Sequence, residues 1–296
     1  MNKGILYGIA AYAIWGIFPV YWKFLQGVPA LQIMTHRVVW SFVFVSILIS
    51  LRHGWRDIFK RLTLRMVLLY LLAGCLLAVN WLVYIYSVNA GFIVESSLGY
   101  FINPLVNVLL GVVFLRERLR PLQWVPVGLA GVGVLYLTIS YGHLPWIALA
   151  LAFSFGFYGL LKKLAPLGSL PGLTVETAVI FLPALAYLLA MEFTGAGSFG
   201  HVSLLQNALL VLTGVVTAVP LLFFAEGARR IPLAMMGLLQ YLAPTLQFLF
   251  GVLVYGEPFT PQRVVGFSII WLALLLYSVE GLVERRRALH AALAEG

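Results

Sequence analysis

The chain is dominated by apolar runs that are each long enough to cross a lipid bilayer. An α-helix needs about 20 mainly apolar residues to span the hydrocarbon core, and short polar or Pro/Gly-containing breaks separate ten such runs. They cover residues 4–24, 31–51, 67–89, 92–114, 122–141, 144–162, 173–193, 206–225, 233–255 and 262–280. The sequence therefore predicts an all-α integral membrane protein with ten transmembrane helices.

Composition and charge exclude the main soluble classes. Of the 296 residues, 62% are hydrophobic and only 10% are charged, whereas about a quarter of a soluble domain is charged. A net charge of +9 would suggest a nucleic-acid partner in a soluble chain, but here the basic residues form short clusters between apolar runs. We expect the lipid bilayer and no nucleic acid as a partner. Cys75 is the single cysteine, so neither a disulfide nor a cysteine metal site is expected.

The basic residues also predict the orientation of the chain. If the ten runs cross the membrane in turn, sixteen of the 19 Lys and Arg residues fall on one side. These are Lys3, Arg52, Arg56, Lys60, Arg61, Arg65, Arg116, Arg118, Arg120, Lys162, Lys163, Arg229, Arg230, Arg285, Arg286 and Arg287. Because Lys and Arg accumulate in cytoplasmic loops, we expect both termini in the cytoplasm.

An internal repeat relates the two halves of the chain. In one ungapped register, identical residues recur 140 positions apart. The pairs are Gly16 and Gly156, Lys23 and Lys163, Pro104 and Pro244, Gly111 and Gly251, Glu117 and Glu257, and Pro121 and Pro261. Each copy holds five spans, an odd number, so the second copy must enter the membrane upside down. We expect a first repeat at residues 1–141 and a second at 142–296, which ends in a short cytoplasmic tail.

Inverted repeats point to transport. Two pseudo-symmetric halves around a site at the membrane midplane can rock between states that open to opposite sides. We interpret the chain as a secondary transporter of a small polar or amphipathic metabolite or drug, as a monomer or homodimer. Proton coupling stays open, as do a passive facilitator, a lipid or ion pathway, and a membrane protein without transport.

The sequence gives no support to an enzyme. HExxH and GxSxG are absent, and the five histidines are scattered, so no catalytic centre, metal or cofactor is expected.

Ionisable residues within spans are functional candidates because they are costly in hydrocarbon. Arg37, preceded by His36, lies about as deep in the second run as Glu95 does in the fourth. We predict an ion pair or shared hydrated cavity for Arg37 and Glu95, either structural or functional, with His36 as a proton-sensitive neighbour. Glu176 overlays His36 in the repeat register, and its shallow position also allows a pair with Lys163 or Arg230.

Aromatic and amide side chains gather near the expected midplane. Pro104 and Pro244 each free a backbone carbonyl there, so they are candidate hinges. A pocket of such side chains suits small solutes, although the same residue types also serve packing. The candidate substrate-binding residues are Trp15, Asn80, Trp81, Tyr84, Tyr100, Asn103, Asn107, Tyr158, Gln240, Tyr241 and Gln247.

Several stretches together resemble a known family. They include AYAIWGIFPVYWK (11–23), HRVVWS (36–41), NWLVYIYSVNAGFIVESSLGYFINPLVN (80–107), LAFSFGFYGLLKK (151–163) and VTAVPLLFF (216–224). The chain resembles RarD-type permeases of the EamA branch of the drug/metabolite transporter superfamily, over nearly its whole length. The resemblance implies ten helices in two inverted EamA repeats, a bacterial inner membrane and a central cavity.

The resemblance also marks residues and departures. The family pattern falls on Trp15, His36, Arg37, Asn80, Trp81, Glu95, Tyr100, Asn103, Pro104, Glu176, Gln240, Tyr241 and Pro244. Two positions depart from that pattern. Gln32 stands where relatives commonly have an acid, and Glu226 occupies a position that is usually small and neutral, where it could contact Arg229 or Arg230.

Overall fold

The computed structural model describes a helical bundle. It covers residues 2–89, 93–140 and 146–254, together with scattered residues between 261 and 283. Within these ranges, the side chains of residues 85, 88, 89, 93–98, 140, 248, 251 and 252 are not described. Every regular element in the described part of the chain is helical, as the sequence predicts.

The helices follow the apolar runs. They are α1 (Lys3–Lys23), α2 (Ala30–Leu51), α3 (Trp55–Arg61), α4 (Leu64–Asn89), α5 (Ile93–Leu115), the 3-10 turn η1 (Pro121–Gln123), α6 (Trp124–Ser140), α7 (Trp146–Leu164), α8 (Ser169–Phe193), α9 (Leu204–Arg230), α10 (Leu233–Gln240) and α11 (Leu242–Leu253). The first nine predicted runs agree with these bounds to within five residues. Local chemistry sets some of the ends: Ser203 and Gln206 form a capping box at the start of α9, which satisfies two free N–H groups.

In the part of the chain that the structure describes, seven helices are long and apolar enough to span a membrane, namely α1, α2, α4, α6 with η1, α7, α8 and α9. The ninth predicted run is divided into α10 and α11 at Tyr241. Pro244 follows three residues later and cannot donate a hydrogen bond to the carbonyl of Gln240. The described residues of the tenth run are helical, but they are interrupted by positions that the structure does not describe. A multi-pass membrane protein is therefore confirmed, while the count of ten spans stays a prediction.

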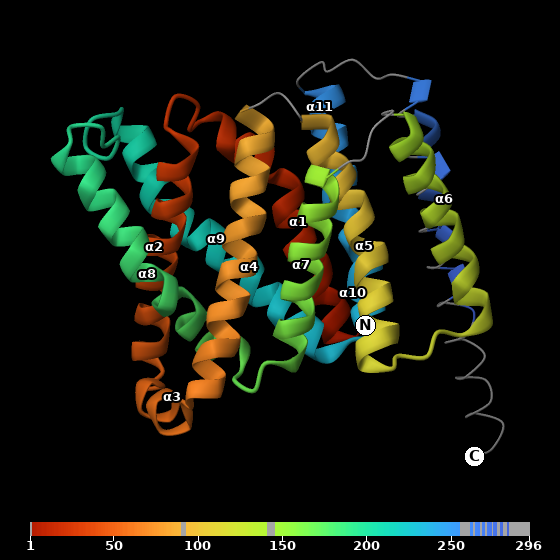
Figure 1. Ribbon diagram of the computed structural model, residues 1–296, viewed down its shortest axis with the longest axis horizontal. Coiled ribbons are helices and arrows are strands. Elements are labelled where there is room, and N and C mark those ends of the chain that lie inside the picture. The colour runs from red at the N-terminus through yellow and green to blue at the C-terminus, as the bar shows by residue number, and fades with distance from the viewer. Residues whose placement is uncertain are drawn as a thin grey trace.

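The helices run between two ends of the bundle (Figure 1). We call the end at which α1 begins the N-terminal end. The short helix α3 lies at this end as well, and it buries Ile58 against Ile49, Tyr70 and Leu167. The loop between α8 and α9 lies at the opposite end. There Gln32 donates a hydrogen bond to the carbonyl of Ala196 and accepts one from the N–H of Ser198. A carboxylate at position 32 could not make the first bond.

The helices of the two repeats are interleaved. The register of 140 residues carries α4 onto α9 and α5 onto α10 and α11. In space, α1 packs against α9 and α11, α2 against α8 and α9, and α7 against α4 and α5. Each repeat therefore buries its main contact faces against the other repeat. The boundary between residues 141 and 142 falls outside the described residues and stays a prediction.

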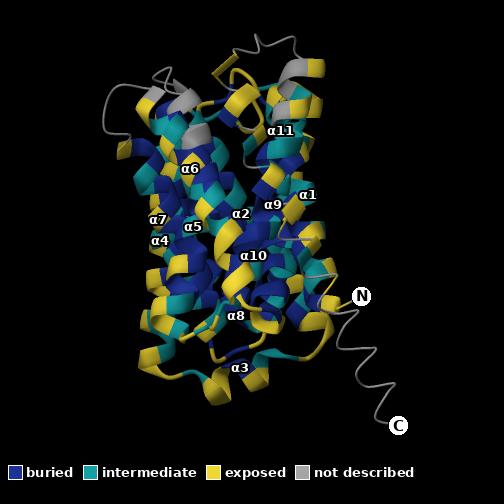
Figure 2. Ribbon diagram, turned by 90° about the vertical axis from the view of Figure 1, so that its right-hand side faces the viewer, coloured by how far each residue is buried: buried dark blue, intermediate teal, exposed yellow. Residues whose placement is uncertain are grey.

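Burial is arranged as expected for a protein in lipid. Figure 2 shows buried residues concentrated inside the bundle, with exposed residues along the flanks of the helices as well as at the ends. Large apolar side chains on these flanks are exposed, among them Leu72, Val113, Leu135, Leu182 and Leu212. The hydrophobic effect does not hold helices together in lipid, so close packing must contribute instead. Gly214 of α9 provides such a contact, because it lies directly against the backbone of Trp40 in α2.

Substitution of Gly214 by alanine should weaken the α2–α9 contact. The added methyl group would overlap the backbone carbonyl of Trp40, and overpacking of this kind typically costs about 1–3 kcal/mol. We expect a lower melting temperature for purified Gly214→Ala. Gly128→Ala on α6 is the matched control, because a methyl group there meets nothing within 4 Å. Equal melting temperatures for the two variants would contradict this account.

Candidate functional site

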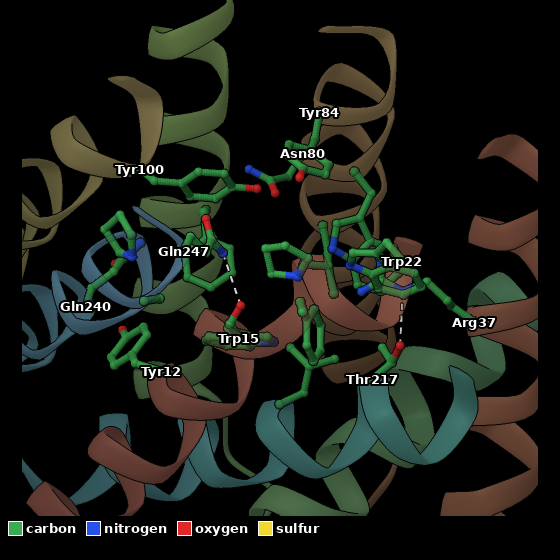
Figure 3. Close-up of a pocket in the computed structure, with 18 residues that line it drawn as sticks. Tyr12, Trp15, Trp22, Arg37, Asn80, Tyr84, Tyr100, Thr217, Gln240 and Gln247 are labelled. Atoms are coloured by element: carbon green, nitrogen blue, oxygen red, sulfur yellow. Dashed lines mark hydrogen bonds between the residues drawn. The ribbon is translucent and has the colours of Figure 1, made fainter. Parts of the chain in front are cut away.

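A central cavity lies where the repeats meet. It holds about 820 Å³ of empty space, part of which is open to the surroundings, and Figure 3 shows the side chains around it. The cavity is lined by Tyr12, Trp15, Phe18, Pro19, Trp22, Arg37, Leu77, Asn80, Trp81, Tyr84, Tyr100, Phe155, Thr217, Leu221, Gln240, Ala243, Pro244 and Gln247. These residues come from α1, α2, α4 and α5 of the first repeat and from α7, α9, α10 and α11 of the second.

The lining contains pairs of positions that are equivalent in the two repeats. Four pairs of lining residues are separated by 140 positions. They are Trp15 with Phe155, Leu77 with Thr217, Trp81 with Leu221, and Tyr100 with Gln240. The cavity therefore straddles the pseudo-symmetry axis, which is where repeat-built transporters place their substrate.

Arg37 brings a positive charge to the wall. Its Nε donates a hydrogen bond to Thr217 Oγ1 at 3.0 Å, which Figure 3 marks. The guanidinium carbon lies 4.1 Å from the ring centroid of Trp81 and 4.8 Å from that of Trp22. Aromatic faces attract cations at such distances. Arg37 is thus fixed by residues of both repeats without a carboxylate among the side chains that the structure describes.

Amide side chains of the wall hold neighbouring helices together. Asn80 donates from Nδ2 to the carbonyl of Leu151 and to Ser154 Oγ, and Gln247 donates from Nε2 to the carbonyl of Trp15. These bonds use the amide nitrogens. They leave the carbonyl oxygens of Asn80 and Gln247 without a hydrogen bond to a described residue.

Aromatic rings close the cavity toward the N-terminal end. Trp15 lies 5.6 Å from Phe155 and 5.8 Å from Phe224, and Phe224 stacks on Tyr158 at 5.9 Å, all between ring centroids. Phe224 and Tyr158 are fully buried. This layer separates the cavity from the charged residues beyond it.

Lys162 and Glu176 form a buried ion pair between the aromatic rings and the N-terminal end. Lys162 Nζ contacts Glu176 Oε2, and the two side chains are only 3% and 1% exposed. The ammonium group also lies 5.5 Å from the ring centroid of Tyr158 and 5.9 Å from that of Tyr70. A buried charge without a partner is strongly destabilising, so the carboxylate of Glu176 is what makes Lys162 tolerable at this depth.

Glu117 and Lys163, together with the helix ends that they contact, form a second group that we call the Glu117 clasp. It lies between the cavity and the N-terminal end. Glu117 accepts hydrogen bonds from the N–H groups of Leu233 and Ala234 at the start of α10. Lys163 lies 3.3 Å from Glu117 and donates to the carbonyls of Ala228 and Ile231 at the end of α9. An acid at a helix start and a base at a helix end both suit the helix dipole, so the clasp stabilises the contact between these helix ends.

Seven of the eleven predicted substrate-binding residues line the cavity: Trp15, Asn80, Trp81, Tyr84, Tyr100, Gln240 and Gln247. The other four, Asn103, Asn107, Tyr158 and Tyr241, are buried beside it. Asn107 links Gln240 to Asn103, and Asn103 donates to the carbonyl of Ala152. Tyr241 donates to the carbonyl of Phe101. In the structure these four side chains contact other parts of the bundle.

The predicted charged residues separate into different environments. Arg37 lines the cavity, but the side chain of Glu95 is outside the described residues, so their pairing stays a prediction. His36 points into another pocket, where its ring packs 5.3 Å from Phe199 and accepts a hydrogen bond from Trp40. Glu176 is paired with Lys162 and not with Lys163 or Arg230, because it lies inside the bundle and does not reach the interface.

The two prolines that were predicted as hinges lie in different surroundings. Pro104 lies within the continuous helix α5, whereas Pro244 lines the cavity just after the break in the ninth run. The lining also includes residues that were not among the binding candidates, namely Tyr12, Phe18, Pro19, Trp22, Leu77, Phe155, Thr217, Leu221 and Ala243. The repeat register would have indicated Leu221, since it is the equivalent of Trp81, but no local pattern distinguishes Thr217 from other span residues.

Comparison with known proteins identifies the family. Residues 2–139 and 145–279 each match the EamA-like transporter family. The chain belongs to this family. It is 49% identical over 284 residues to the uncharacterized transporter YojE of Bacillus subtilis, covering 94% of each chain. It is 48% identical over 290 residues to Protein RarD of Streptomyces exfoliatus, covering 97% of this chain and 91% of that one.

These findings confirm the resemblance to RarD-type permeases and the presence of two EamA repeats. A solved crystal structure with 18% identity matches at a TM-score of 0.71, covering 94% of this EamA chain and 98% of the other. That match shows a shared fold.

The Lys162–Glu176 pair predicts strong energetic coupling. Lys162→Met and Glu176→Gln should each lower the free energy of unfolding by about 3–5 kcal/mol, because each leaves a buried charge without its partner. The double variant should lose much less than the sum of the singles. Unfolding in a denaturing detergent gives the free energy of unfolding of the unmodified protein, the two single variants and the double variant. The exposed pair Glu226 and Arg230, 2.7 Å apart, is the control and should couple by at most about 1 kcal/mol. Additive losses at Lys162 and Glu176 would contradict the coupling.

Proposed function

We propose that this EamA protein is a secondary transporter that moves a small polar or amphipathic solute through the central cavity by alternating access. The supporting observation is a cavity lined by equivalent positions of both repeats. Such a site can stay in place while the halves rock around it. The carboxylate and helix ends of the clasp would separate when the N-terminal end opens. Under this proposal the protein is not an enzyme.

We further propose a bacterial inner membrane location with both termini in the cytoplasm. The basic residues gathered at the N-terminal end support this orientation, since Lys and Arg are retained on the cytoplasmic side. In this orientation the clasp is an inner closure, and the cavity reaches toward the outer end of α1 at Trp22.

Transport itself is tested by flux into proteoliposomes. Labelled benzoate, indole-3-acetate, alanine, adenine, ethanolamine and chloramphenicol should be compared with vesicles that lack protein. We expect saturable uptake of at least one probe. Uptake that never exceeds the protein-free rate would count against transport.

Alternating access predicts which positions a membrane-impermeant thiol reagent can reach. In a Cys75→Ser background, Ala243→Cys in the cavity should react when the reagent is added to the outside of cells. Ala228 is fully buried, and its carbonyl accepts a hydrogen bond from Lys163 of the clasp. Ala228→Cys should therefore stay unreactive in inside-out vesicles. Adding Glu117→Gln should raise its labelling severalfold, because the clasp loses its charge. Equal labelling of Ala228→Cys with and without Glu117→Gln would argue against a closure at this end.

A further inference from the structure

The guanidinium of Arg37 has binding capacity that the described protein groups do not use. Its Nε donates a hydrogen bond to Thr217, and its guanidinium carbon lies over the rings of Trp22 and Trp81. The two terminal nitrogens carry four N–H groups, and these make no hydrogen bond to a described residue. Among the described lining residues, Arg37 is also the one with a formal charge.

A cation in this position favours an anionic ligand. Aromatic rings attract the guanidinium but do not neutralise it, and a charge held away from bulk water is costly without a counter-charge. The terminal edge of a guanidinium matches the two oxygens of a carboxylate through parallel hydrogen bonds. A neutral solute would displace water from this edge without supplying a counter-charge.

The other side chains of the cavity wall favour a ligand whose uncharged part is flat and apolar. Trp15, Trp81, Tyr84 and Tyr100 present large rings, and Leu77, Leu221 and Ala243 add apolar surface. Flat apolar groups pack well against such rings. An amine would place a second positive charge near Arg37, and a doubly charged phosphate would exceed the single charge available.

We propose that the solute bound in this cavity is a monocarboxylate with a planar apolar body, held through its carboxylate by the terminal nitrogens of Arg37. This inference rests on the proposed transport function and narrows its substrate class. Thr217 and the two tryptophans fix the arginine before the ligand arrives, which lowers the entropic cost of binding. Because Thr217 belongs to the second repeat and Arg37 to the first, the ligand would bind at a point where both halves are already joined.

The test compares three probes that share one ring system, namely indole-3-acetate, indole-3-acetamide and tryptamine. Each is titrated against the melting temperature of the purified full-length protein, since a ligand of the folded state raises it. We expect a saturable rise with the acid, at least about tenfold weaker binding of the amide, and no rise with the amine. A charge-assisted bidentate contact contributes at least this factor. Sodium chloride at the same ionic strength is the comparison for a small inorganic anion.

Variants of Arg37 test whether the acid binds at this residue. Arg37→Gln should abolish the response to the acid, and Arg37→Lys should weaken it at least about tenfold because a lysine lacks the planar fork. Arg230→Gln removes the same charge from an exposed position at the N-terminal end and should leave the response unchanged. If Arg37→Gln does not fold, the three probes on the unmodified protein decide by themselves.

Several outcomes would overturn the proposal. They are equal binding of acid and amide, no response to the acid, an equal response to chloride, and an unchanged response in Arg37→Gln. The proteoliposome flux assay distinguishes failure of the carboxylate proposal from failure of the transport proposal. Saturable flux of neutral probes alone would support transport and contradict a carboxylate substrate. Binding of the acid without flux of any probe would support the carboxylate ligand and contradict transport.

Discussion

Charge inside an apolar bundle must be compensated locally, and the arrangement of this protein depends on how that is done. Lys162 is matched by a carboxylate, Lys163 by a carboxylate and two helix-end carbonyls, and Arg229 by the carbonyls of Ala165 and Leu167. All three lie toward the N-terminal end. Arg37 differs because two aromatic rings and a hydroxyl surround it. The first three cations therefore join helices at this end, whereas the terminal nitrogens of the fourth make no hydrogen bond to a described residue.

The two repeats share a backbone plan but differ in side-chain chemistry. In the register of 140 residues, Lys162 and Glu176 occupy the positions equivalent to Trp22 and His36. One copy thus places an ion pair where the other has an indole and an imidazole. The cavity lies between these arrangements, so the common fold supplies its location and the divergent side chains supply its polarity.

Much of the fold could be predicted from the sequence, because the requirement for apolar helices of fixed length leaves few alternatives. The sequence also placed Trp15, Tyr100 and Gln240 among the candidate binding residues near the midplane. Sequence could not distinguish Asn103 and Asn107 from true lining residues, since a buried amide that joins helices and an amide that faces a cavity have the same local pattern. The partner of Glu176 was equally hidden, because depth along one helix does not specify which neighbouring helix supplies the counter-charge.

The interleaving of the repeats has a consequence for how the protein is made. A chain emerging from the ribosome inserts α1, α2, α4 and α5 first, yet the main neighbours of these helices are α7, α8, α9, α10 and α11. The early helices must therefore wait in the membrane with their contact faces covered by lipid or by a chaperone. The bundle can close only when the late helices arrive, so its assembly is a late and concerted step of biosynthesis.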